Sequence, residues 1–189
     1  MRKNIVLLTF LILSLIVISG CQPATDEMKG EQNSPEGDTG ITLAGISLGD
    51  TINDVEASLG KDYIIECSDE DSGWWGEPVT RIYYGDDMEI IIGDETGQVL
   101  QIALNSDRYT TTNGDKVGDE AQKVLPGYQE KYPPAKDHFE GNDLPGWFVV
   151  EEEVWLIFNF KDDGTMVNEP IEPREKVESI HLVYEKFMH

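Results

Sequence analysis

The chain has 189 residues, and 37 acidic residues against 14 basic ones give it a net charge of −23 at pH 7. This excess argues against a nucleic-acid partner, which selects a basic face, and against a protein that lies flat on anionic lipid. We interpret the charge as a solvated surface that favours solubility, with a cationic partner or bound divalent ions as the alternative.

The N-terminal segment has the pattern of a secretory signal peptide. Arg2 and Lys3 precede an apolar run from Ile5 to Ile18, which at 14 residues is shorter than the roughly 20 residues that span a bilayer. We therefore predict a signal peptide over residues 1–20 rather than a membrane-spanning helix. The ending Ile-Ser-Gly before Cys21 resembles the lipobox of bacterial lipoproteins. That resemblance implies a lipidated Cys21 that anchors the protein to the membrane on the extracytoplasmic side of the envelope.

Residues 21–40 are predicted to hold the lipidated cysteine and a flexible acidic tether. The stretch after Cys21 is rich in Pro, Gly, Ser and acids, and it has too few apolar residues to bury. Removal of residues 1–20 would leave 12 basic residues against 37 acidic ones, a net charge of −25. The remainder, 41–189, is predicted to form a single α+β domain.

The first half of this domain, 42–104, begins with a predicted helix over 50–59. Thr51 and Asp54 have the spacing of a capping box, and Gly60 has the place of a helix-ending glycine. Ile52, Val55 and Leu59 lie on one helical face. Four strands are then predicted at 62–67, 79–84, 88–92 and 98–104, separated by turns rich in Gly and Asp.

The second half, 105–189, repeats this order. A helix is predicted over 116–125 and is ended by Pro126 and Gly127. A hairpin follows at 147–150 and 154–160, and a last strand at 177–184. The repetition predicts two related units, each a short helix followed by antiparallel strands, that share one sheet with both helices on the same face. The second unit carries additional segments at 132–146 and 165–176.

Residues 45–60 carry a motif that includes Gly45, Gly49, Thr51, Asp54 and the pair Leu59-Gly60. This motif resembles the helix entry of small secreted bacterial domains, including the SmpA/OmlA outer-membrane lipoproteins and the β-lactamase-inhibitor-like (BLIP-like) fold. It is also similar to uncharacterised lipoproteins of Gram-positive bacteria. The resemblance implies a tandem helix-plus-sheet fold. It carries over no functional residue, and the usual proline after the Leu-Gly pair is replaced here by Lys61 and Asp62.

Residue patterns typical of catalysis are missing. His138, His181 and His189 are scattered, and the sequence has neither a Gly-x-Ser-x-Gly elbow nor a phosphate-binding loop. We therefore predict no catalysis and no cofactor. Cys67 alternates with apolar residues in a predicted strand, so we expect it to be alone, buried and inert. The alternative is a nucleophile, which would need a base beside it.

Asp69, Glu70 and Asp71 are weak candidates for a calcium site. They offer closely spaced oxygen ligands before Gly73, but they lack the closing glutamate and the length of an EF-hand loop. Acidic residues at turns are commonly solvated, and we therefore predict no metal.

The aromatic residues are the best indication of a binding surface. Trp74 and Trp75 stand between glycines, Tyr83 and Tyr84 end a predicted strand, and Trp147 occupies a related place in the second half. Exposed Trp and Tyr are frequent at interfaces. The alternative is that Trp75 and Trp147 complete the core of the domain.

Together these patterns predict a lipid-anchored, non-catalytic binding or assembly module of the bacterial envelope, whose partner is an envelope protein or polymer. The alternative is a secreted enzyme inhibitor similar to the BLIP-like proteins, and a metal-dependent hydrolase comes third. A binder requires an exposed apolar patch, an inhibitor a protruding loop, and a hydrolase a pocket with converging acids.

Overall fold

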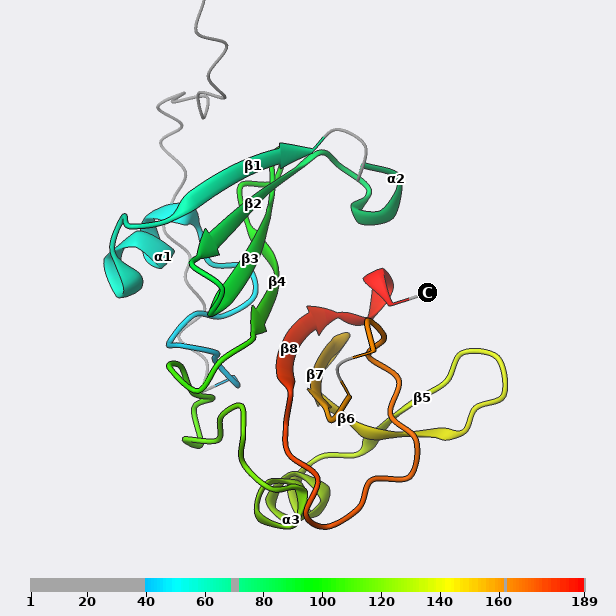
Figure 1. The fold of residues 1–189 in the computed structure, drawn as a ribbon. Coiled ribbons are helices and arrows are strands. Elements are labelled where there is room, and N and C mark those ends of the chain that lie inside the picture. The colour runs from blue at the N-terminus through cyan, green and yellow to red at the C-terminus, as the bar shows by residue number, and fades with distance from the viewer. Residues whose placement is uncertain (1–39, 69–71, 162, 189) are drawn as a thin grey trace, which may run out of the picture. The chain divides into compact units, whose positions relative to one another are not determined.

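In a computed structural model, the described residues are 40–68, 72–161 and 163–188. The predicted signal peptide, Cys21, nearly all of the tether and the acidic residues Asp69, Glu70 and Asp71 lie outside them. The described part is mainly one antiparallel sheet of eight strands with a few short helices (Figure 1). This agrees with the predicted α+β class. The strands are β1 (Ile64–Ser68), β2 (Val79–Tyr84), β3 (Met88–Gly93), β4 (Val99–Leu104), β5 (Pro134–Lys136), β6 (Asp143–Glu151), β7 (Val154–Asn159) and β8 (Ser179–Tyr184). The helices are α1 (Ile52–Leu59), α2 (Ser72–Trp75), α3 (Ala121–Lys131) and the 3₁₀ turn η1 (Glu185–Phe187).

The order of strands across the sheet is β1-β2-β3-β4-β8-β7-β6-β5. The last strands of the two halves, β4 and β8, pair at the centre, from Gln101 opposite Val183 to Leu104 opposite Ile180. The first strands, β1 and β5, lie at the two edges. A helix precedes each set of four strands, α1 before β1 and α3 before β5. Each half of the sheet therefore contains strands that are consecutive in the sequence.

Helix α1 has the predicted capping. Asp54 accepts hydrogen bonds from the Thr51 hydroxyl at 2.6 Å and from the Thr51 N–H at 2.9 Å. At the other end, Gly60 has φ 84°, in the left-handed region that favours glycine, and its N–H donates to the carbonyl of Glu56. The side chain of Val55 is fully buried, so the apolar face of this short helix holds it against the sheet.

Helix α3 differs from its prediction at both ends. It begins at Ala121, because the preceding residues pair with another segment: the Gly118 N–H donates to the Val177 carbonyl at 2.7 Å. It also continues through Pro126 to Lys131. Proline costs a helix one hydrogen bond, but the helix buries Ala121, Val124, Leu125 and Tyr128. We attribute the continuation past Pro126 to this buried face.

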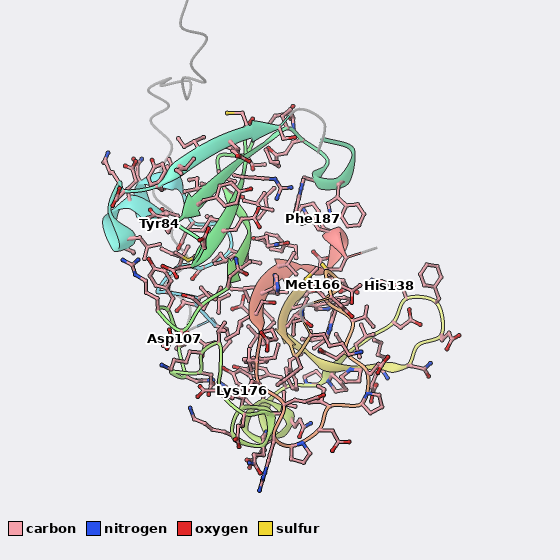
Figure 2. The ribbon with its side chains drawn as sticks, viewed as in Figure 1. Tyr84, Asp107, His138, Met166, Lys176 and Phe187 are labelled. Atoms are coloured by element: carbon pink, nitrogen blue, oxygen red, sulfur yellow. The ribbon has the colours of Figure 1, made fainter. Side chains whose placement is uncertain are left out.

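Both faces of the sheet are buried in part. On one face, Val55 of α1 and Val124 of α3 belong to the same apolar cluster as Ile90, Ile102 and Leu156 of the strands. The second face carries a smaller cluster, which includes Trp75 of α2 and Phe187 of η1. Figure 2 shows Phe187, Met166 and His138 on segments that lie beside this second face.

Candidate functional site

The five aromatic residues predicted to form a binding surface do not lie together on the surface. Trp75 and Trp147 are 7% and 5% exposed. Trp75 packs on the ring of Phe187, and the Trp147 indole N–H donates to the Met166 carbonyl at 2.9 Å. Trp75 and Trp147 are therefore part of the core, which was the alternative to a place on the binding surface.

The remaining three aromatic residues have different surroundings. Tyr84 is buried, its hydroxyl donates to the Gly60 carbonyl at 2.8 Å, and burial raises its pKa to about 12. Tyr83 is half-buried and points to the opposite face, because successive strand residues alternate. Trp74 is 52% exposed. Of the five predicted residues, Trp74 is thus the one with a largely accessible side chain.

The edge strand β1 is exposed and partly apolar. Ile64 and Ile65 are 66% and 50% exposed. Cys67, predicted to be buried, is exposed instead, because β1 lies at the end of the sheet, where the side chains have few neighbours. Cys67 is also disulfide-bonded, so the predictions of a lone thiol and of a nucleophile are wrong for this structure. The partner of that bond is outside the described residues.

The hairpin between β5 and β6 carries the most exposed large apolar side chain among the described residues. Phe139 is 91% exposed at the tip of this hairpin. The backbone around it is tied by the Asp137 carboxylate, which accepts from the N–H groups of Phe139 at 3.2 Å and Glu140 at 2.7 Å. The Asp137 N–H in turn donates to the Asn142 carbonyl at 2.8 Å. The tip therefore has a defined conformation although its phenyl ring lies in solvent.

One contact closes the hairpin across its own strands, and another holds it on the rest of the domain. Lys136 and Asp143, opposite each other in β5 and β6, form an ion pair at 2.7 Å. The ring of His138 stacks on Trp155 of β7, with 5.4 Å between the ring centroids. The segment belongs to the additional stretch 132–146, for which the sequence patterns predict no role. The spacing of Asp137 and Gly141 around an isolated Phe was the available signal for a tight, exposed tip.

A separate polar pocket lies over the ends of β4, β7 and β8. Its volume is about 410 Å³. It is lined by Asn105, Asn159, Lys161, Gly164, Thr165, Met166, Glu178, Ser179 and His181. The lining contains one carboxylate, so it lacks the converging acids that a metal-dependent hydrolase would need. Throughout the described ranges, no group of three or more His, Cys, Asp or Glu residues could hold a metal ion.

Ser179 and His181 form the one pair in this pocket that resembles a nucleophile and its base. The Ser179 hydroxyl and His181 Nε2 are 2.8 Å apart. A catalytic base also needs a third group that orients it, and His181 Nδ1 is buried without a hydrogen-bond partner among the described residues. Burial lowers the pKa of His181 to about 4, so the imidazole is neutral at pH 7.

The carboxylate of Glu77, which the sequence patterns do not single out, is buried and has a structural role. Glu77 is 8% exposed and accepts from the N–H groups of Glu95 at 2.7 Å and Thr96 at 2.9 Å. The Thr96 hydroxyl donates to its other oxygen at 3.0 Å. Glu77 thereby holds the turn between β3 and β4, and its hydrogen bonds explain its burial without any ligand.

Comparisons with protein-family models, with curated proteins and with solved structures find no match for this chain. Within the ranges that the structure describes, no helix is long and apolar enough to cross a membrane.

Proposed function

We propose that this protein is a lipid-anchored binding module of the bacterial envelope that engages a protein partner without catalysis. The observation that carries the proposal is Phe139, whose ring is 91% exposed on a hairpin tied by its own hydrogen bonds. An aromatic ring on an ordered support binds with little loss of conformational entropy. Phe139 therefore has the properties of an interface anchor.

The charge around Phe139 indicates the chemistry of the partner. Residues 136–143 contain the acidic residues Asp137, Glu140 and Asp143 and the basic residue Lys136, and the whole chain has a net charge of −23. Charges at the rim of an interface steer association and select complementary partners. We expect an apolar pocket with a basic rim on the partner protein.

Isolation of the partner with matched variants tests this proposal. Phe139→Ala should abolish co-purification of the partner with the lipidated protein, because it removes the anchor and none of the hydrogen bonds of the tip. Val167→Ala is the control, since Val167 is also exposed, at 58%, but lies on a different loop. Equal recovery of the same partner by wild type and both variants would contradict a role for Phe139.

An enzyme inhibitor is the second candidate, and the same hairpin favours it. A projecting loop held in one conformation is the shape that enters a cleft. In that case the purified protein should inhibit its partner enzyme, and Phe139→Ala should raise the inhibition constant by at least about tenfold, the size of a loss of 1.4 kcal/mol. A partner whose activity is unaffected at full occupancy would instead support the role in binding or assembly.

The proposed anchor is the lipid on Cys21. Cys21→Ala should leave the precursor uncleaved or release the protein from membranes, and unchanged membrane fractionation and mobility would contradict the lipoprotein assignment. The chain has two cysteines, so a lipidated Cys21 and an intramolecular disulfide of Cys67 exclude each other. Mass spectrometry of the mature protein should therefore find the lipid on Cys21, and a Cys21 that carries a disulfide instead would contradict the proposed anchor.

We also propose that the domain arose by duplication of a helix followed by four strands. In support, the strand order in the sheet is symmetric about the pair β4 and β8, and both helices pack in one apolar cluster. Residues 42–104 and 105–189 should then superpose with α1 on α3 and with β1 to β4 on β5 to β8, in order. An optimal superposition that shifts this order by a strand would contradict the duplication.

A further inference from the structure

The polar pocket over β4, β7 and β8 is distinct from the hairpin that carries the proposed function. Its floor is part of the central sheet, where His181 of β8 lies between Ala103 of β4 and Ile157 of β7. Ser179, two residues before His181 on β8, pairs with Asn159 of β7. Because these strands are internal to the sheet, the floor has a fixed geometry.

One wall of the pocket is also held in place. Asn159 Nδ2 donates to the carbonyls of Lys161 at 2.8 Å and Thr165 at 3.0 Å, so the amide ties the chain that follows β7. Lys161 forms an ion pair with Glu169 at 3.2 Å. The buried Asn168 fixes the far end of this segment through the Phe158 carbonyl at 2.8 Å. The pocket is therefore formed before any ligand arrives, as most small-molecule sites are.

The groups left for a ligand are mainly hydrogen-bonding and uncharged. The side-chain amide of Asn105 is exposed, while its backbone N–H donates to the Asp87 carbonyl. The Ser179 hydroxyl retains bonding capacity beyond its contact with His181. Glu178 adds an acceptor, and Met166 provides apolar contact. The positive charge of Lys161 is matched by Glu169. This set offers donors and acceptors together but no net positive charge for an anion.

We propose that this pocket binds a neutral sugar of one or two rings. A sugar presents hydroxyl groups, which can bond to the amide, hydroxyl and carboxylate groups of the lining. It also presents C–H groups, which can pack on Met166. The volume of about 410 Å³ lies within the usual range for small-ligand sites, about 300–1,000 Å³. A sugar hydroxyl bonded to Ser179 would extend the hydrogen bond from Ser179 to His181, and such chains strengthen one another.

Titration of the purified domain with defined disaccharides, followed by ¹H–¹⁵N NMR, tests the proposal. Maltose and N,N′-diacetylchitobiose sample plain and N-acetylated sugars. At least one should shift the resonances of Ser179, His181 and Asn105 saturably. Each of Asn105→Ala and Ser179→Ala should weaken its binding about fivefold, the effect of one lost hydrogen bond of about 1 kcal/mol.

Two controls separate this site from the rest of the molecule. Asn113→Ala removes an exposed amide elsewhere and should leave the binding of the disaccharide unchanged. Phe139→Ala should also leave it unchanged, so that failure of the sugar site and failure of the hairpin proposal are distinguishable. The absence of saturable shifts with both disaccharides at tens of millimolar would overturn the proposal. Binding that persists unaltered in Asn105→Ala and Ser179→Ala would overturn it as well.

Discussion

Replacement of His181 by glutamine should make the stability of the protein less sensitive to acid. Burial lowers the pKa of His181 from 6.5 to about 4 in the folded chain. The unfolded chain therefore takes up this proton first as the pH falls. The contribution of the neutral histidine is fully present above pH 6.5 and is lost as the pH falls to about 4. A shift of this size corresponds to a loss of about 3 kcal/mol in the free energy of unfolding.

Glutamine is a suitable replacement because its side-chain amide can occupy the place of Nε2, which contacts the Ser179 hydroxyl at 2.8 Å. Urea unfolding of wild type and His181→Gln, followed by tryptophan fluorescence between pH 7 and pH 4, gives both stability curves. Hydrogen bonds from Thr51 hold the pKa of Asp54 below its usual value, so acid also removes that contribution, but equally from both proteins. Between pH 7 and pH 4, the free energy of unfolding of wild type should fall by about 3 kcal/mol more than that of His181→Gln. Parallel curves would refute the assignment of a His181 that is neutral in the folded chain.

Further predictions concern the core, the tryptophans and the charge. Val55→Asp and Val124→Asp should each lower the free energy of unfolding by at least about 3 kcal/mol, because each buries an unpaired charge. Val167→Asp, at an exposed site, should have little effect. Equal melting temperatures for all three variants would contradict the described core. Trp74→Ala should leave the melting temperature nearly unchanged, because Trp74 is 52% exposed. Trp75→Ala should lower the free energy of unfolding by about 3–5 kcal/mol, because Trp75 is 7% exposed. A larger loss of stability from Trp74→Ala than from Trp75→Ala would place Trp74 in the core instead. Added salt should raise the melting temperature, because the acidic residues repel one another at a net charge of −23 and salt at 0.1 M screens this repulsion beyond about 10 Å. A melting temperature that falls with added salt would argue against this repulsion.

The first half of the domain could be predicted closely because its signals are local. The capping of α1 by Thr51, Asp54 and Gly60 depends on residues within a few positions of one another, and the structure has it as predicted. Strands β2, β3 and β4 lie within a residue of the predicted bounds, because glycine and aspartate turns separate alternating apolar residues. The predicted turns between these strands need no information from distant parts of the chain.

Features that depend on distant partners could not be predicted in this way. Helix α3 starts late because residues before it pair with the segment around Val177, and it passes Pro126 because its buried face outweighs one lost hydrogen bond. Trp75 and Trp147 were ambiguous, because whether a tryptophan is buried depends on the segment that covers it, here η1 and the loop at Met166. The exposure of Phe139 likewise depends on the absence of a covering segment among the described residues.

Site-specific photocrosslinking in intact cells tests the central claim, a protein partner engaged through Phe139, most directly. A photoreactive phenylalanine analogue at position 139 of the lipidated protein keeps the aromatic ring in place, and the same analogue at position 167 provides the control. We predict one discrete crosslinked protein from position 139 and none of that product from position 167. No crosslinked product at position 139, or identical products from both positions, would contradict the claim.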